Sequence, residues 1–177
     1  MVTGSDHGRR YSIGELDGLP WRRLAQVCSN TMVPAHFRKV AERRLALRVE
    51  RLALGEQIAL ARIAPRAVLA DLVRLREGQV LEAVLGNPKT TFADLIDFLR
   101  DRGLPPAALR HVGEHHHWGE PVEVRSMIVA HPSTPVHTAL TVLATLPEKE
   151  VRRLLGEGSL PPVVAIQARR LHDGEEE

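Results

Sequence analysis

Histidines form the arrangement in this sequence that most resembles a site for chemistry. His111 and His115 stand four residues apart, the spacing at which two imidazoles on one face of a helix can share a metal ion. Glu114 or His131 would be available as a further ligand. Together these side chains would suit Zn²⁺ or a similar cation, provided that one helix carried both members of the first pair.

Other features of the same run argue against a metal site. Gly113 is predicted to end the helix between the two histidines, and the His-Glu-x-x-His order of zinc enzymes is not present. His115, His116 and His117 are three histidines in succession, followed by Trp118. We therefore interpret the run as an exposed loop at a corner between helices, anchored by the tryptophan, and predict no metal ligands in the chain.

Basic residues form a second candidate site. Six of them fall in an expected helix over residues 34–54, in which Arg44, Arg48 and Arg51 would share one side and could grip successive phosphates of a duplex. Residues 1–63 hold 11 Lys and Arg against 6 Asp and Glu, whereas residues 64–177 hold 13 against 16. We favour a solvated outer face and keep nucleic-acid binding as the alternative. The possible binding face consists of Arg38, Lys39, Arg43, Arg44, Arg48 and Arg51.

Motifs for catalysis are absent from the sequence. The one cysteine, Cys28, has only Asn30 and arginines near it in the chain, and no Gly-x-Ser-x-Gly elbow is present. Neither glycine-rich phosphate-binding motif occurs. We predict that the protein is not an enzyme and that it has no catalytic residues and no cofactor.

Composition indicates closely packed helices. Hydrophobic residues make up 44% of the 177 residues but aromatic residues only 3%, so the apolar side chains are almost all Leu, Ala, Val and Ile. The lone cysteine cannot form an internal disulfide, and no run is long and apolar enough to cross a membrane. We therefore expect a soluble, cytoplasmic protein of all-α class that has no contact with a membrane.

An internal repeat gives the strongest prediction of architecture. Residues 80–91 align without a gap with residues 124–135, and in both copies the turn contains a proline, Pro88 or Pro132. The apolar residues after each turn recur at positions i, i+3, i+4 and i+7, as in a helix with one buried face. We predict that Thr134, and Thr90 or Thr91 in the first copy, cap the helix that follows.

Proline marks the starts of other expected helices. Pro34, Pro105 and Pro161 each follow Leu or Val and each precede apolar residues at +3 and +7. Proline is well suited to the first turn of a helix because its missing N–H would have no partner there. Such segments alternate with the repeated turn along most of the chain.

The Asn/His-Pro-x-Thr turn between helices resembles that of HEAT-like and leucine-rich-repeat-variant bacterial α-solenoids. This resemblance covers residues 21–171 and implies a short right-handed α-solenoid, a HEAT-like superhelix, of about ten helices. It also implies a binding surface, since members of such families mostly bind diverse partners. The iron–sulfur centre of some leucine-rich-repeat-variant proteins cannot be carried over to a chain with a single cysteine.

These observations predict one repeat domain over residues 20–171, between a flexible segment at residues 1–19 and an acidic tail at residues 172–177. The expected function is that of a non-catalytic scaffold or adaptor that recognises another protein along a groove between helices. The alternative is a nucleic-acid-binding solenoid that uses the Arg-rich N-terminal third. The sequence does not specify the oligomeric state, or whether His115–His117 has a role of its own.

Overall fold

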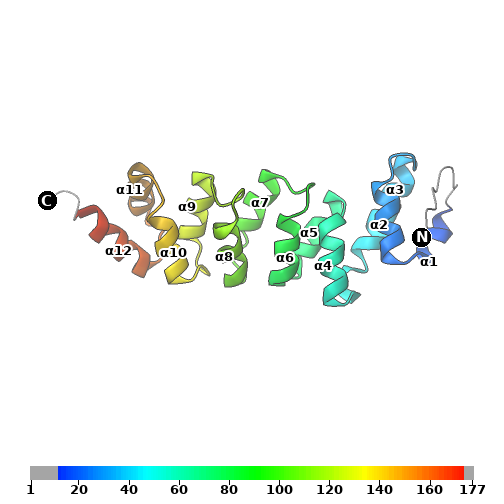
Figure 1. The fold of residues 1–177 in the computed structure, drawn as a ribbon, viewed down its shortest axis with the longest axis horizontal. Helices are drawn as coiled ribbons and strands as arrows, with labels where there is room; N and C mark the ends of the chain where they lie inside the picture. The colour runs from blue at the N-terminus through cyan, green and yellow to red at the C-terminus, as the bar shows by residue number, and fades with distance from the viewer. Residues whose placement is uncertain (1–11, 174–177) are drawn as a thin grey trace. The chain divides into compact units, whose positions relative to one another are not determined.

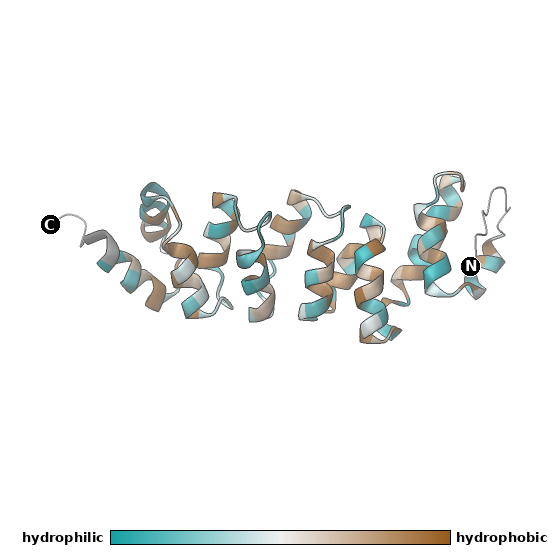
Figure 2. Ribbon diagram, in the orientation of Figure 1, coloured by the Kyte–Doolittle hydropathy of each residue, from teal (hydrophilic) through white to brown (hydrophobic). Residues whose placement is uncertain are grey.

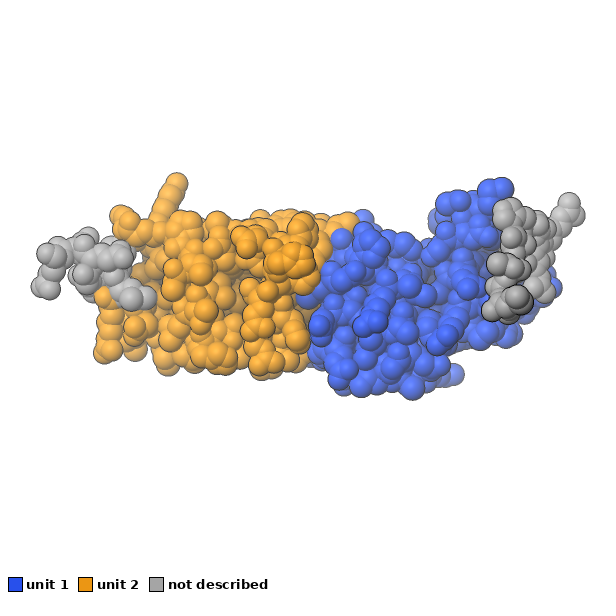
Figure 3. Space-filling view, in the orientation of Figure 1, with its two compact units in different colours: residues 1–90 blue, residues 91–177 orange. Residues whose placement is uncertain are grey.

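Helices make up all the regular structure in residues 12–173, the part of the chain that the computed structural model describes (Figure 1). The predicted all-α class is confirmed for these residues. They form twelve α-helices and one short 3₁₀ helix, so the expected count of about ten was too low. The chain divides into two compact units, residues 1–90 and residues 91–177, which Figure 3 colours separately.

Unit 1 (residues 1–90) packs its helices in two rows. Helices α1, α3 and α5 contact one another in sequence, and α2, α4 and α6 form the second row. The rows meet most extensively where α2 packs on α3. The helices of this unit are α1 (Ile13–Gly18), α2 (Trp21–Ser29), α3 (Ala35–Ala46), the 3₁₀ helix η1 (Val49–Arg51), α4 (Leu54–Ile63), α5 (Arg66–Arg74) and α6 (Gly78–Leu85).

Unit 2 (residues 91–177) repeats this plan. Helices α7, α9 and α11 form one row, α8, α10 and α12 form the other, and α9 packs closely on α10. Each helix therefore contacts the one that lies two places along the chain. The helices of this unit are α7 (Phe92–Leu99), α8 (Pro106–Glu114), α9 (Val122–Ala130), α10 (Val136–Leu143), α11 (Glu148–Glu157) and α12 (Pro162–Asp173).

Many helices begin immediately after a proline, whereas the sequence pattern places the proline at the first helical position. Seven helices have a proline as the residue before the first helical one, in extended or near-extended conformation. Its carbonyl accepts the first helical hydrogen bonds, as Pro20 O does from the backbone N–H groups of Arg23 and Leu24. Because proline disfavours helix in the residue before it, each also separates the new helix from the preceding one.

The N-terminal segment is more ordered than expected. Within residues 1–19, which the sequence predicts to be flexible, residues 13–18 form α1; residues 1–11 lie outside the described part. Ser12 and Glu15 form a reciprocal capping box at its start. Leu16 is fully buried and anchors the helix on unit 1. A single apolar anchor produces no periodicity, so the pattern analysis missed it.

The Arg-rich helix expected over residues 34–54 is also shorter than predicted. Helix α3 ends at Ala46, and the chain passes through η1 before α4 begins. The break lets Val49 enter the core, where it is buried, and the Gln57 side chain donates to Val49 O at 3.1 Å. Gln57 thus gives a second hydrogen bond to a carbonyl that already accepts from the Leu52 N–H.

Each unit has a core of aliphatic side chains. Leu24, Leu45, Leu60 and Leu72 are fully buried in unit 1, and in unit 2 Leu109, Val124 and Ile128 are equally enclosed. Figure 2 shows hydrophobic and hydrophilic residues on the same helices, as expected where one side of each helix is buried.

Candidate functional site

A recurrent corner joins successive helices. At each such corner a polar side chain accepts a hydrogen bond from the backbone N–H two residues further on, as in an Asx turn. The helix before it has then ended, and the next begins five residues after the polar residue, or seven after His115. The five pairs are Asn30 with Met32 N (2.9 Å), Asn87 with Lys89 N (2.8 Å), Asp101 with Gly103 N (2.9 Å), His115 with His117 N (3.2 Å) and His131 with Ser133 N (3.1 Å).

Two of these corners also bond to a neighbouring helix, and they are the two that the repeat aligns. Asn87 Nδ2 donates to Ala61 O (2.7 Å) and Ala64 O (3.2 Å) at the end of α4. His131 Nε2 lies 3.0 Å from Asp101 O, just after α7. Since His131 Nδ1 accepts from Ser133 N, the hydrogen must be on Nε2. The predicted equivalence of the Asn87 and His131 corners is confirmed.

The role predicted for Thr134 is wrong. Its Oγ1 donates to Ile128 O (2.6 Å) and so closes the end of α9, while Pro135, which has no side-chain donor or acceptor, precedes α10. Thr90 Oγ1 does the same for Val84 O (2.5 Å) at the end of α6. Only Thr91 caps a following helix, through a capping box with Asp94. A threonine hydroxyl can either donate to a carbonyl or accept from an N–H, and the position of the threonine in the sequence does not distinguish the two.

The histidine run forms a corner and not a group of ligands. Helix α8 continues to Glu114, so the prediction that Gly113 ends it is wrong. His115 Nδ1 accepts from the N–H groups of His117 and Trp118. In residues 12–173, no group of three or more His, Cys, Asp or Glu side chains is placed to hold a metal ion. Partial burial, with His116 and His117 adjacent, lowers the pKa of His115.

A glycine closes this corner tightly. Gly119 is buried and donates its N–H to His115 O at 2.8 Å. A Cβ at position 119 would lie 2.6 Å from Gly113 O and 2.9 Å from His115 O, both backbone atoms of the corner. Trp118, 8% exposed, is buried beside it. The conformation of the corner after α8 therefore depends on the close backbone contacts of Gly119 and on the burial of Trp118.

The predicted basic face is divided among different roles. Arg44 Nε lies 2.5 Å from Asp17 Oδ1, and Arg48 donates to the backbone carbonyls of Asp17 and Leu19 at the end of α1. Arg51 belongs to η1 and not to α3. Arg44, Arg48 and Arg51 therefore do not form a row on one helix.

The remaining three basic residues of that set lie on α3. Lys39 and Arg43 are exposed and form no ion pair with another described residue. The carbonyl of Arg38 lies 3.9 Å from the Cys28 thiol, within reach of a weak hydrogen bond. Burial raises the pKa of that thiol to about 12, so Cys28 is a buried thiol and not a thiolate nucleophile at neutral pH.

A groove lies between α9 and α11 in unit 2. Its volume is about 450 Å³, and both helices line it with apolar and acidic side chains. Helix α9 contributes small or flexible residues, so the two helices leave space between them. The lining residues are Val122, Glu123, Ser126, Met127, Ala130, Glu150, Arg153, Leu154, Glu157 and Ser159.

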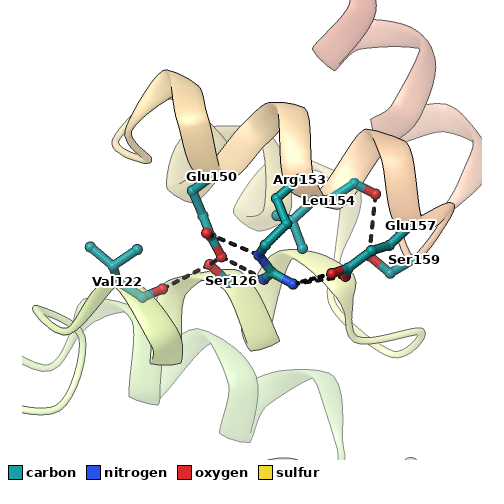
Figure 4. A network of polar contacts seen from close by, with 7 residues as sticks. All are labelled: Val122, Ser126, Glu150, Arg153, Leu154, Glu157 and Ser159. Atoms are coloured by element: carbon teal, nitrogen blue, oxygen red, sulfur yellow. Dashed lines mark hydrogen bonds and ion pairs between the residues drawn. The ribbon is translucent and has the colours of Figure 1, made fainter.

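Charged side chains of α11 fix one wall of this groove (Figure 4). The Arg153 guanidinium lies between two carboxylates, bonding Glu150 through Nε (3.0 Å) and Nη2 (2.6 Å) and Glu157 through Nη1 (2.6 and 2.7 Å). Ser126 Oγ on α9 donates to Glu150 Oε1 at 2.6 Å and thereby joins the two helices. The bonds from Arg153 and then Ser126 lower the pKa of Glu150 to about 2.

A second groove lies in unit 1, between α4 and α6. It encloses about 390 Å³ and is lined by Ile58 and Arg62 of α4 and by four residues around α6. Those four are Gln79, Glu82, Ala83 and Gly86, and the repeat aligns them with Glu123, Ser126, Met127 and Ala130 of the other groove. The same helix face therefore borders a groove in both units.

This helix face was not predicted from the sequence, although the repeat alignment contains mismatched positions that fall on it. Most core positions of the repeat match in chemical type, as Val84 does with Ile128 and Leu85 with Val129, although buried Leu81 aligns with Arg125. The four groove positions change in charge or in size between the two copies. These mismatches recur at i, i+3, i+4 and i+7 and so share one helix face, on which Ala83 and Ser126 are buried at the edge of the groove.

Comparison with known proteins identifies no relative. No family model, curated protein or solved structure matches the chain. Within the described residues, none of the helices combines the length and the apolar character that crossing a membrane requires.

Proposed function

We propose that this protein is a non-catalytic scaffold or adaptor, an α-solenoid of the HEAT-like kind that binds another protein along the grooves between its helices. Two observations made within single units support the architecture. Each unit stacks its helices in two rows in which each contacts the one two places on, and the corner at Asn87 recurs at His131. Stacks of this type bury a shared core and leave a continuous outer surface for partners.

The observation that carries the binding role is the recurrence of a groove on the same helix face. Residues at four equivalent repeat positions border a groove in unit 1 and again in unit 2, while their side chains differ. Repeat proteins keep core positions uniform to maintain the fold, so differences concentrated on a grooved face favour recognition over packing. Grooves of 390 and 450 Å³ are large enough for one or two side chains of a partner.

Blocking each groove tests this function. Gly86→Arg would fill the unit 1 groove, where an added Cβ meets only atoms at 3.7 Å or more, and Ala130→Arg would fill the unit 2 groove. Ala70→Arg and Ala144→Arg add the same charge at exposed positions that line neither groove. We expect immobilised native chain to capture specific proteins from an extract of its own cells, and at least one groove variant to lose them. The proposal fails if both groove variants capture the same proteins as the controls.

Nucleic-acid binding remains the alternative function, supported by the charge of unit 1. Residues 1–90 hold 15 Lys and Arg against 9 Asp and Glu, a net charge of +6. Exposed Lys39 and Arg43 would be available to phosphates. The engagement of Arg44 and Arg48 with α1 weakens this alternative, because the predicted row of free guanidinium groups is not formed.

A further inference from the structure

The groove between α9 and α11 combines an apolar surface with an excess of negative charge. Val122, Met127 and Ala130 of α9 supply accessible apolar atoms, and Leu154 of α11, which also lines the groove, is 2% exposed. Its charged lining residues are three glutamates and one arginine, which gives the groove a net charge of −2. Both features face one space of about 450 Å³, so a partner that fits must satisfy both.

The arrangement of charge leaves the negative side chains accessible. Arg153 is held by Glu150 and Glu157, so its positive charge is locally compensated and its side chain cannot swing out to meet an anion. Glu157 is 51% exposed on the outer side of this cluster. Glu123, across the groove on α9, is exposed and forms no ion pair with a described residue. Glu123 is therefore open to a cation, while the exposed Glu157 accepts from Arg153 and belongs to a cluster of two carboxylates and one guanidinium with a net charge of −1.

We infer that this groove binds a basic amphipathic helical segment of another protein, whose apolar residues contact Val122 and Met127 while its Lys or Arg residues pair with Glu123 and Glu157. This inference rests on the proposed function and names the class of partner for one of its two grooves. Helix-in-groove recognition uses apolar anchors at i, i+3, i+4 and i+7, and methionine adapts to anchors of different shape. Unit 2 as a whole adds to the attraction, with 9 Lys and Arg against 13 Asp and Glu.

The unit 1 groove has a different preference. Its charged lining residues are Arg62 and Glu82, which balance, and it has no counterpart of Met127, since Ala83 stands at that position. A basic amphipathic peptide therefore gains neither net attraction nor a flexible apolar contact there. The two grooves of one chain provide an internal comparison for the test.

Peptide binding to the full chain tests the inference. The probe is a labelled peptide of about 14 residues that carries Leu at the anchor positions i, i+3, i+4 and i+7 and Lys at the others. Its binding is measured by fluorescence anisotropy at low salt. One comparison peptide has Glu in place of Lys, and another has Ser in place of Leu. We expect the Leu/Lys peptide to bind more tightly than both, and its binding to weaken between about 50 and about 200 mM salt.

Matched variants locate the binding. Glu123→Gln with Glu157→Gln should weaken the Leu/Lys peptide about fivefold, because two exposed ion pairs are lost. Glu114→Gln with Glu120→Gln changes the net charge equally at exposed positions outside the groove, and it should have little effect. Circular dichroism of each variant verifies that the helices are retained.

Several results would overturn the inference. These are equal binding of the Leu/Glu or Ser/Lys peptide, or an equal effect of the two double variants. Such results leave the proposed function standing if Ala130→Arg still abolishes capture of a cellular protein. If neither Ala130→Arg nor Gly86→Arg changes that capture, the proposed function itself fails.

Discussion

The two units share a plan but use charged residues differently. In unit 1, with a net charge of +6, Arg44 on α3 and Arg48 just after it reach the Asp17 side chain and the carbonyls at the end of α1. In unit 2, with a net charge of −4, most ion pairs stay within one helix, as Arg153 does with Glu150 and Glu157 on α11. Stacking in two rows therefore depends on the corners and the aliphatic core, and the sign of the surface charge is free to serve binding.

The corners show a related difference. In unit 1 the Asn87 amide bonds two carbonyls of α4, whereas in unit 2 the His131 ring bonds one carbonyl after α7. Unit 2 additionally has the corner after α8, where Gly119 lies against backbone oxygens. Both units join neighbouring helices through side-chain bonds, and unit 2 adds a corner with close backbone packing at Gly119.

Gly119→Ala should have the largest effect on stability. The new Cβ would lie 2.6 Å from Gly113 O, and because both atoms belong to backbone, the corner itself must shift. We expect a loss of about 3 kcal/mol in the free energy of unfolding, measured by urea denaturation. Gly156→Ala is the control, since a Cβ on that residue of α11 meets nothing within 4 Å. Equal effects of the two substitutions would show that close backbone packing does not distinguish unit 2.

Asn87→Ala should have the next largest effect. The substitution removes two bonds to carbonyls of α4 from a residue that is 3% exposed, so it leaves buried acceptors unsatisfied. We expect a loss of about 2 kcal/mol in the free energy of unfolding. The Asn30 side chain makes the same local turn and no further hydrogen bond within the described residues, and Asn30→Ala should therefore cost much less. Comparable losses would mean that the turn, and not the bond between helices, carries the stability.

Arg48→Ala separates stability from phosphate binding in unit 1. Its guanidinium group satisfies two carbonyls at the end of α1, so its removal should lower the free energy of unfolding by about 1 kcal/mol. Binding of a labelled DNA duplex should be weak and unchanged, as measured by fluorescence anisotropy at increasing salt. Lys39→Ala with Arg43→Ala is the matched pair of exposed charges. Tight duplex binding that is lost with Arg48 would support the nucleic-acid alternative.

Much of the fold could be predicted from the sequence because it depends on local chemistry. Proline before helices, the apolar spacing and the turn after Asn87 act over a few residues, and all of them are visible in one chain. The break after Ala46 could not be predicted in this way, because it depends on Val49 entering the core and on Gln57 reaching back to its carbonyl. The same limit applies to Leu16, whose burial depends on the helices around it.

The candidate site was harder to predict than the fold. Reading residues by type favoured Arg44 and Arg48, yet both interact with α1, over distances along the chain that no local pattern reveals. The groove face was present in the repeat alignment as mismatched positions, such as Ala83 against Met127. Mismatch identifies a face only when the core register is known, and that register came from the structure.

The smallest predicted effect is a loss of stability at acid pH, and it concerns Glu150 in unit 2. The pKa of Glu150 is lowered from 4.5 to about 2 by hydrogen bonds from Arg153 and Ser126. As the pH falls below 4.5, Glu150 becomes protonated in the unfolded chain, whereas in the folded chain it stays ionised until about pH 2. Stability that Glu150 contributes above pH 4.5 is therefore lost across this window.

This acid effect should be small because Arg153 is 48% exposed and water screens the pair. The measurement is the urea midpoint of native chain and Glu150→Gln at several pH values through that window. The native midpoint should be higher than that of the variant above the window and should converge on it towards pH 2. The variant lacks the titrating group, so a difference that stays constant with pH would trace the stabilisation to packing between α9 and α11. A difference that closes with acid would show that the charge of Glu150 holds the wall of the groove in place.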